Sequence, residues 1–317
     1  MSVRLTLRSL LISKKHFFLL KIKKASNTMT PFLLEWFMFL NINISMKHLL
    51  IGISLLTFTA LTSCETINST PQNDLGDPLK TLKSKADDPV DSLESNLIAY
   101  YPLNNSALDE SGNHYNGTAF NLKPVFDRHN NPNSAYYFNV KNSYITVEDN
   151  TDLRLNNTDF TINYWVSLDE FYPLSGSAVF SKNNGPNLNG WNCSITGLGF
   201  VDGSVGRAFY NVSGGSDPYV VGIKALNLSK WHMITVLYTL SASKIMLYVD
   251  GKQDQTSMNI PSPNPLTNAK LHIGKNSFND PRGTTPEYFI KGKLDDMRIY
   301  NRKLSESQIA ALYTCLK

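Results

Sequence analysis

Oxygen-bearing side chains crowd one short stretch of the chain, Asp109-Glu110-Ser111-Gly112-Asn113. Its first, third and fifth residues offer the hard oxygen ligands that calcium collects, six to eight at a time, from turn loops. The stretch is not an EF-hand, because His114 stands at its sixth position and Phe120 at its twelfth. We expect Asp109 and Asn113 to bind a structural calcium ion. The alternative is a solvated turn closed by an Asx-turn.

Carboxylate pairs suited to glycoside hydrolysis are not evident. A retaining glycosidase needs two carboxyl groups about 5 Å apart, which two alternate positions on one strand face supply. The neighbouring acids are Glu148-Asp149, Asp169-Glu170 and Asp295-Asp296. In a regular strand Asp295 and Asp296 point to opposite faces. His232 lies in an apolar segment as a packed histidine would, and no His/Cys cluster has zinc spacing. We therefore expect no enzyme activity.

Aromatic, amide and guanidinium side chains gather between residues 171 and 220, in segments rich in Gly, Asn and Ser. Binding pockets combine aromatic walls with a few polar groups, and they commonly lie on loops of a rigid scaffold. This composition suits a sugar, which offers an apolar ring face and hydroxyl groups. The expected ligand-binding residues are Tyr172, Asn184, Trp191, Arg207, Tyr210 and Tyr219. The alternative is that these rings only cover the edges of the fold.

The net charge of +4 is concentrated at the N-terminus. Residues 1–64 contain eight Lys and Arg but one acid, Glu35, which leaves 22 basic and 25 acidic side chains in residues 65–317. A body with a net charge of −3 has no basic surplus for a phosphate backbone, so we exclude nucleic acid as a partner. With 42% hydrophobic and 11% aromatic residues, the chain is not wholly disordered.

Residues 46–64 (MKHLLIGISLLTFTALTSC) have the layout of a secretory signal, with a positive start, an apolar run and small residues at the end. The final Leu61-Thr62-Ser63-Cys64 resembles the bacterial lipobox. That resemblance implies that Cys64 is lipidated and becomes the mature N-terminus. The alternative is an uncleaved anchor helix.

Two further segments flank this signal. We interpret residues 1–45 as the result of a translation start assigned too far upstream, with Met46 as the true start. Their one apolar stretch is too short to span a membrane. The alternative is a membrane-inserted leader. Residues 65–95 contain no aromatic residue and three prolines, so they predict a flexible tether ahead of a folded domain over 96–317.

Short β-branched and aromatic segments recur from residue 96 onward, separated by Asn, Gly, Asp and Pro. This pattern predicts an antiparallel sandwich or barrel. The predicted strands are 96–103, 135–140, 143–148, 160–168, 178–181, 191–195, 207–212, 231–239, 244–249, 270–274 and 289–300. Asp250-Gly251 predicts a two-residue hairpin. Ser305-Glu306-Ser307-Gln308 is a capping box and predicts a short helix over 305–312. Along 160–168, Phe160 and Trp165 should face opposite sides.

Seven motifs in order resemble a LamG-like jelly-roll domain of the concanavalin A-like lectin/glucanase group. They lie at 97–103, 109–118, 143–147, 160–166, 231–236, 247–252 and 292–305. The resemblance implies an all-β fold, an antiparallel jelly-roll β-sandwich with one short C-terminal helix. In this group a calcium ion often joins the first loop to an Asp of the last strand, so by resemblance Asp295 joins Asp109 and Asn113. Enzymes of the group carry a Glu-x-Asp-x-Glu type of strand, which this sequence lacks.

These features predict a lipoprotein of the cell envelope, anchored by its lipid to a bacterial membrane, either the outer membrane or the cell surface. Its predicted role is non-catalytic binding of a glycan or another cell-surface ligand. The alternatives are a glycoside hydrolase or polysaccharide lyase of the same fold, and a structural or adhesive envelope module. Cys193 is expected to be a buried thiol, and the alternative is a disulfide with Cys315.

Overall fold

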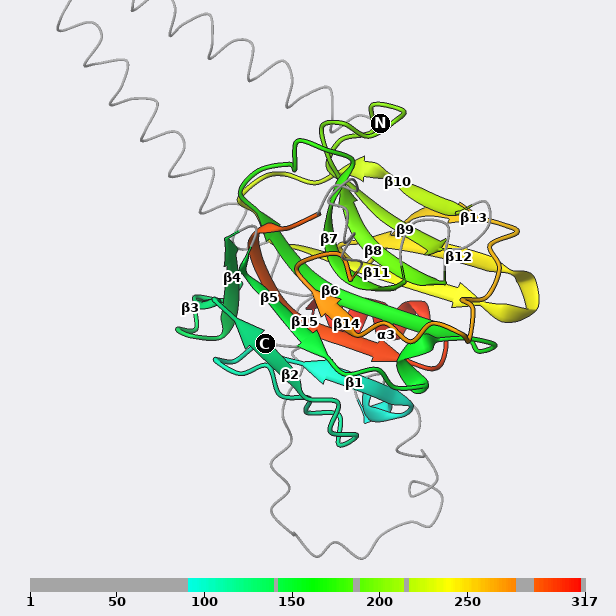
Figure 1. The fold of residues 1–317 in the computed structure, drawn as a ribbon, viewed down its shortest axis with the longest axis horizontal. Coiled ribbons are helices and arrows are strands. Elements are labelled where there is room, and N and C mark those ends of the chain that lie inside the picture. The colour runs from blue at the N-terminus through cyan, green and yellow to red at the C-terminus, as the bar shows by residue number, and fades with distance from the viewer. Residues whose placement is uncertain (1–90, 140–141, 185–188, 214–216, 278–287, 315–317) are drawn as a thin grey trace, which may run out of the picture. The chain divides into compact units, whose positions relative to one another are not determined.

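The computed structural model describes residues 91–139, 142–184, 189–213, 217–277 and 288–314 (Figure 1). The expectations for residues 1–64, for most of the tether and for Cys315 lie outside these described residues. The described part consists of two antiparallel sheets followed by one short helix, which confirms the predicted all-β sandwich.

Sheet A has eight strands, which are β1 (Leu97–Tyr101), β3 (Lys123–Val125), β4 (Ala135–Asn139), β6 (Phe160–Leu168), β11 (His232–Thr239), β12 (Lys244–Val249), β13 (Lys252–Ser257) and β15 (Lys291–Tyr300). Their order is β13-β12-β11-β6-β15-β4-β3, and β1 also pairs with β15. Sheet B has seven strands, which are β2 (Gly117–Phe120), β5 (Tyr144–Val147), β7 (Gly176–Asn183), β8 (Gly190–Thr196), β9 (Arg207–Ser213), β10 (Tyr219–Ala225) and β14 (Leu271–Ile273). Their order is β10-β9-β8-β7-β14-β5-β2. Among the described residues, the helices are α3 (Glu306–Thr314) and three 3₁₀ turns, Asp91–Glu94, Asp152–Arg154 and Leu240–Ala242.

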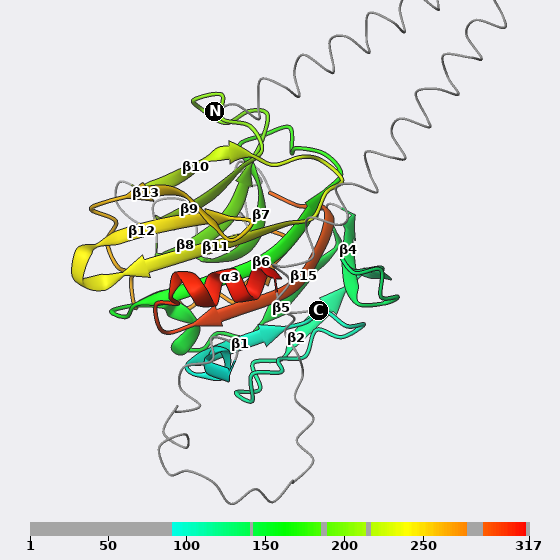
Figure 2. The same cartoon turned by 180° about the vertical axis from the view of Figure 1, so that it is seen from behind.

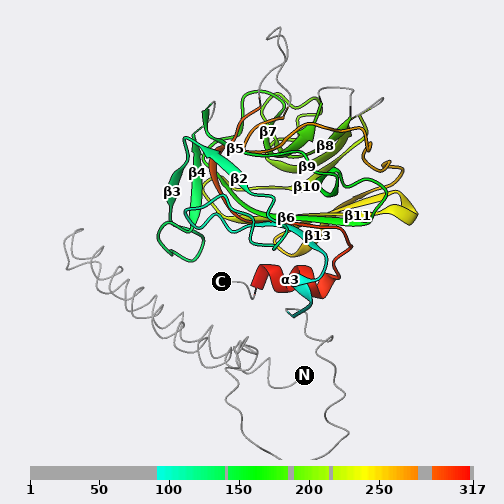
Figure 3. The same cartoon turned by 60° about the horizontal axis from the view of Figure 1, so that its bottom comes forward.

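Strand β6 shows how the sheets divide their side chains. Phe160, Ile162 and Tyr164 lie in the core between the sheets, whereas Trp165 belongs to a second apolar cluster with Leu312 of α3. Successive side chains of a strand point to opposite faces, so the predicted separation of Phe160 from Trp165 is confirmed. Figures 2 and 3 show α3 lying against the side of sheet A that faces away from sheet B.

Two local signals in the sequence form as predicted. The backbone N–H of Gln308 donates to Ser305 Oγ at 3.2 Å, and the N–H of Ser305 donates to Gln308 Oε1 at 3.0 Å, which is a capping box. Asp250 and Gly251 have φ values of 54° and 73°, as a two-residue type I′ hairpin between β12 and β13 requires.

The segment assigned to the tether is shorter than predicted, because Leu93 is 6% exposed and packs in the apolar cluster that contains Trp165.

Strand β15 is irregular where it carries its two acids. Its register with β6 shifts between Asp295 and Arg298, and Asp296 has a φ of 45°. Such a β-bulge re-aims side chains, and here it turns both carboxylates toward Arg128. Arg128 Nη1 lies 2.5 Å from Asp295 Oδ2, and Nη2 lies 2.6 Å from Asp296 Oδ2. The prediction that Asp295 and Asp296 point to opposite faces is wrong, because it assumed a regular strand.

Candidate functional site

The outer face of sheet B, turned away from the core, carries polar and aromatic side chains. Alternate residues of β8 and β9 belong to the core, namely Trp191, Cys193, Ile195, Ala208, Tyr210 and Val212. The residues between them therefore point outward, namely Asn192, Ser194, Phe209, Asn211 and Ser213. The alternating residues of β8 and β9 therefore supply both the core and the accessible outer surface of sheet B.

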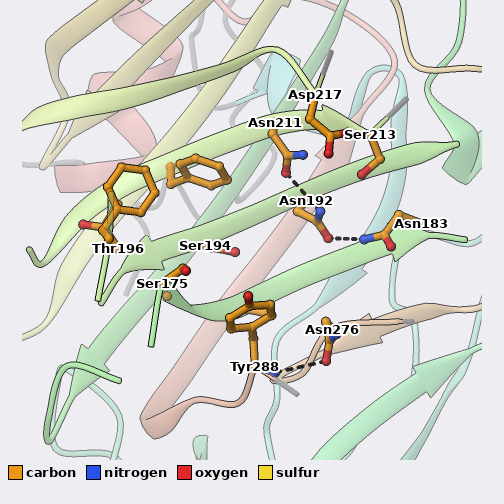
Figure 4. Close-up of a pocket in the computed structure, with 14 residues that line it drawn as sticks. Ser175, Asn183, Asn192, Ser194, Thr196, Asn211, Ser213, Asp217, Asn276 and Tyr288 are labelled. Atoms are coloured by element: carbon orange, nitrogen blue, oxygen red, sulfur yellow. Dashed lines mark hydrogen bonds between the residues drawn. The ribbon is translucent and has the colours of Figure 1, made fainter. Parts of the chain in front are cut away.

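This surface contains a hollow of about 250 Å³, which Figure 4 shows in close-up. Its lining residues are Ser175, Gly176, Ala178, Asn183, Asn192, Ser194, Thr196, Phe200, Phe209, Asn211, Ser213, Asp217, Asn276 and Tyr288. The hollow is close to the lower end of the usual size range of small-molecule pockets, about 300–1,000 Å³. Its lining is mostly amide, hydroxyl and aromatic.

Three asparagine amides cross the hollow from strand to strand, and we call them the amide relay. Asn183 Nδ2 donates to Asn192 Oδ1 at 2.5 Å, and Asn192 Nδ2 donates to Asn211 Oδ1 at 3.0 Å (Figure 4). Ser181 Oγ, which is fully buried, also donates to Asn192 Oδ1 at 2.5 Å. The amide relay therefore holds three polar side chains in fixed orientations on a rigid sheet.

Aromatic rings flank the amide relay. Phe209 and Tyr219 stack with ring centroids 5.6 Å apart, and Phe200 meets the ring of Phe209 edge-on, also at 5.6 Å. Tyr219 is 47% exposed at the edge strand β10. Tyr288 comes from the segment before β15, and its ring packs edge-on against Tyr172 at 6.4 Å. Aromatic rings that remain partly exposed beside fixed amides can hold the apolar face of a ligand.

Four of the six predicted ligand-binding residues lie at or beside this hollow. Tyr219 and Tyr172 contact rings that line it, as described above. The backbone N–H of Arg207 donates to Thr196 Oγ1, a lining residue, at 2.9 Å. Asn184 follows the lining residue Asn183, but its side-chain amide is engaged with Asn268 and the backbone of Ala269.

Trp191 and Tyr210 do not present a surface to any ligand. Both are 0% exposed in the core, and the Trp191 indole N–H donates to the carbonyl of Leu153 at 3.0 Å. The prediction that Trp191 and Tyr210 bind a ligand is wrong, because they occupy the inward positions of β8 and β9. Sequence reasoning missed their outward neighbours Asn192 and Asn211. The signals that identify them are the alternation of W-N-C-S-I-T in β8 for Asn192 and of Y-N-V-S in β9 for Asn211.

The hollow contains little charge. Asp217 is the single acidic residue among its described lining residues, and none of those residues is Lys or Arg. Glycoside hydrolysis needs two carboxyl groups that flank the bond. The described lining therefore holds one carboxylate where that mechanism uses two.

The carboxylate pair of β15 lies elsewhere and is buried. Asp295 is 2% exposed and Asp296 is 9% exposed beneath Arg128, whose guanidinium lies 4.5 Å from the centre of the Trp165 ring. Burial and the neighbouring charge of Asp296 raise the pKa of Asp295 to about 8. Burial opposes ionisation of Asp296 as well, but Arg298 and Arg128 hold its pKa below the usual value. These acids stabilise a junction between β15 and the loop before β4, and neither lines the hollow.

Asp109, a predicted calcium ligand, is satisfied by protein donors. Its Oδ1 accepts from the backbone N–H groups of Tyr100 and Ser111, both at 2.9 Å. Its Oδ2 accepts from Ser111 Oγ and from the N–H of Tyr115, again at 2.9 Å. Four hydrogen bonds use the lone pairs that a calcium ion would need. This is the Asx-type turn that the sequence leaves as the alternative.

The other two predicted ligands do not complete a calcium site with Asp109. Asn113 Nδ2 donates to the carbonyls of Leu97 and Ile98 at 3.1 and 2.9 Å, and Asp295 is paired with Arg128. Across the part of the chain that the structure describes, no group of three or more His, Cys, Asp and Glu could hold a metal ion. The residues present do not fit calcium in this arrangement, and calcium binding stays a prediction.

His232 is packed, as the sequence predicts. It is 6% exposed, its Nε2 accepts from the backbone N–H of Asn227 at 3.1 Å, and its Nδ1 lies 3.0 Å from Asp250 Oδ2. Hydrogen bonds to His232 and Lys224 lower the pKa of Asp250 to about 2, although burial opposes this. The arrangement joins β11 to the β12–β13 hairpin. Cys193 is a free thiol in the core.

Several solved structures have a fold similar to this β-sandwich. Domain 4 of AbnA, a GH43 extracellular arabinanase from Geobacillus stearothermophilus solved with arabinotriose, is 22% identical with a TM-score of 0.53, over 69% of this chain and 98% of that one. The binding domain of Paraclostridial Mosquitocidal Protein 1 is 19% identical with a TM-score of 0.53, over 69% and 52%. The binding domain of botulinum neurotoxin DC, solved with rat synaptotagmin II, is 15% identical with a TM-score of 0.51, over 71% and 53%. At these identities the likeness establishes the fold alone.

The chain spans about half the length of the two toxin binding domains. No curated protein matches the sequence. Among the described helices, none is long and apolar enough to cross a membrane. The profile of Laminin_G_3, described as the concanavalin A-like lectin/glucanases superfamily, matches residues 139–310, which is more than half of the chain. Together with the two-sheet architecture, this match means that the chain belongs to the concanavalin A-like lectin/glucanases superfamily.

Proposed function

We propose that this protein binds a glycan, without cleaving it, in the hollow on the outer face of sheet B. The observation that carries the proposal is the amide relay of Asn183, Asn192 and Asn211 beside the rings of Phe209 and Tyr288. Fixed amides match the hydroxyl groups of a sugar, and aromatic walls match its C–H surface.

Binding is favoured over hydrolysis because the described lining of the hollow has one carboxylate and not a pair. Retaining and inverting glycosidases both use two acids on either side of the scissile bond. Asp217 is the single acid among the described lining residues, and the pair on β15 is buried beneath Arg128. The solved domain with arabinotriose supports a sugar ligand by fold analogy.

A glycan microarray probed with the full chain, followed by calorimetric titration of the best ligand, tests the proposal. Asn192→Ala removes the central member of the amide relay, so it should weaken binding at least about tenfold, a loss of about 1.4 kcal/mol. Asn301→Ala is the matched control, because Asn301 is exposed after β15 on the other sheet. Equal affinity of the two variants, or binding to no glycan, would refute the proposed function.

We also propose that the chain is a lipoprotein of the cell envelope. The support is the signal-like segment 46–64 with its terminal Cys64 and the proline-containing tether that follows. Lipid at Cys64 would hold the sandwich at a membrane surface with its glycan site free to reach a neighbouring polymer. Direct measurement of acylation at Cys64 is the test.

A further inference from the structure

Arg207 stands beside one end of the hollow. It begins strand β9, and because its neighbour Ala208 belongs to the core, its side chain leaves the outer face of sheet B, as that of the lining residue Phe209 does. Two residues of a strand span about 7 Å, so the two side chains start close together. The backbone N–H of Arg207 donates to Thr196 Oγ1 at 2.9 Å. Figure 4 shows Thr196 at the end of the hollow away from Asp217.

The guanidinium of Arg207 has no hydrogen-bond or ion-pair partner among the described residues. Its Nε is shielded from solvent without an acceptor, whereas its Nη groups stay accessible because the side chain is only half-buried. The acid whose charge reaches it is Asp202, but the two form no ion pair, and Asp202 Oδ1 accepts from the backbone N–H of Ser204 at 2.7 Å. Hydrogen bonds from Ser204, and to a smaller extent the charge of Arg207, lower the pKa of Asp202.

The other arginines that the structure describes are all engaged. Each of them donates to carboxylate, carbonyl or amide oxygens, namely Arg128, Arg154, Arg298 and Arg302. A guanidinium has five N–H donors and keeps its charge at any ordinary pH, so leaving it half-buried and unmatched is costly. Folded proteins satisfy nearly all such groups, and each exception calls for an explanation. An acceptor brought by a ligand explains the exception at Arg207.

We propose that Arg207 recognises an anionic group of the ligand, so that the hollow binds an acidic glycan. The anionic group is a carboxylate or a sulfate, since either offers two oxygens that the Nη groups can bind in parallel. It would lie at the Thr196 end, away from Asp217, with the neutral part of the sugar in the hollow. Partial burial of the guanidinium strengthens its attraction to an anion. This inference rests on the proposed function and adds the charge of the ligand and the residue that recognises it.

The test compares the full chain with its Arg207→Gln variant, which loses the charge and keeps a polar side chain. The probes are matched sets on one array: neutral hexose oligosaccharides, the same oligosaccharides oxidised to uronates at C6, and the same oligosaccharides sulfated at O6. The wild type should bind one acidic set at least about tenfold more tightly than the neutral set, which corresponds to about 1.4 kcal/mol. Arg207→Gln should lose most of this preference and keep its affinity for the neutral set.

Lys303→Gln is the matched control. It removes the same charge from an exposed position between β15 and α3, so it should keep the preference of the wild type. Thermal melting shows whether Arg207 has a structural role instead. Arg207→Gln should melt within about 4 °C of the wild type, because its guanidinium has no hydrogen bond to lose. A larger fall would reveal a structural partner and overturn the proposal.

The outcomes separate the acidic ligand from glycan binding itself. A preference for uronates or for sulfated sugars that Arg207→Gln loses supports the proposal and identifies the anionic group. Three results would overturn it and leave glycan binding in place: a wild type that binds the neutral set as tightly, a preference that survives in Arg207→Gln, or an equal loss in Lys303→Gln. Binding to no member of the array would overturn both.

Discussion

Replacing Arg128 by methionine tests the buried charge cluster on β15. The Arg128 side chain is 6% exposed, bridges Asp295 and Asp296, and lies over the ring of Trp165. Methionine is also long and unbranched, so it preserves apolar contact with Trp165 and removes only the guanidinium. The substitution therefore isolates the electrostatic part of the interaction.

The expected cost is large because Asp295 loses its ion-pair partner. A buried charge left without compensation destabilises a protein by about 3–5 kcal/mol. Asp296 is less affected, since Tyr100 Oη still donates to it at 2.7 Å and Arg298 Nη2 still lies 3.2 Å away. The loss should therefore come mainly from Asp295.

The cost should depend on pH. Burial and Asp296 raise the pKa of Asp295 to about 8, so between pH ~4 and ~8 the folded protein keeps a proton that the unfolded chain releases. In that window stability falls as the pH rises, by at most about 1.4 kcal/mol per pH unit. His272 acts in the opposite sense, because burial lowers its pKa to about 4 and its contribution to stability is lost as the pH falls below about 6.5. The effect of Asp295 is therefore best seen between about 6.5 and 8.

Urea unfolding of the full chain, followed by tryptophan fluorescence at pH 6.5 and pH 9, measures the effect. Arg128→Met should cost more at pH 9, where Asp295 is ionised, than at pH 6.5, where it is neutral. The double variant Arg128→Met/Asp295→Asn should recover most of the loss, and Asp295→Asn alone should flatten the pH dependence between 6.5 and 8. If Arg128→Met stays within about 0.5 kcal/mol of the wild type at both pH values, the cluster does not hold β15 in place.

Cys64→Ala should abolish incorporation of labelled palmitate and release the protein from membranes, and equal labelling of the variant would exclude lipidation at this residue. Limited proteolysis should cut first within residues 65–90 and leave a resistant fragment that retains Leu93, which packs in the Trp165 cluster; early cuts inside the sandwich would contradict this boundary. If calcium binds as the sequence predicts, it should raise the melting temperature, and chelator and Asp295→Ala should each abolish the rise; an unchanged melting temperature would mean that Asp109 serves only the hydrogen bonds described for it. Gly251→Ala should lower the free energy of unfolding by about 1–2 kcal/mol in urea, because its φ is 73° and its Cβ would approach the Tyr313 side chain at 3.2 Å.

The interior strands could be predicted from the sequence, whereas three strands at the ends of the sheets could not. Strand β6 is buried along its whole length, and its β-branched and aromatic residues identify it without any tertiary information. The sequence does not predict β2, β3 or β10, and each of them lies at the end of a sheet. An edge strand is paired on one side and partly solvated, so its composition resembles that of a loop. The proline in β3 (Pro124) illustrates this, because such a residue is tolerated where no partner needs its N–H.

The segment 171–220, predicted to bind a ligand, supplies most of the residues that line the hollow, but the individual residues predicted there were partly different ones. Choosing aromatic types selected Trp191 and Tyr210, which the core requires, over Asn192 and Asn211, which the solvent face exposes. The alternation within β8 and β9 contains this information once one inward residue is known. The bulge at Asp296 differs in kind, because its φ of 45° follows from how β15 meets β6 and the Arg128 loop. No local pattern in the sequence specifies that contact.

The two faces of β7, β8 and β9 therefore depend on each other, because the same strands carry the core residues on one face and the amide relay on the other. Trp191 and Tyr210 are close-packed in the core, and that packing fixes the strands on which Asn192 and Asn211 stand. A ligand entering the hollow meets amides already oriented by the relay, so little side-chain entropy remains to be lost on binding. On this reasoning, a cavity at Tyr210 should weaken ligand binding even though its ring never reaches the surface. The loss of affinity would come from disorder of the amide relay and not from a lost contact with the ligand.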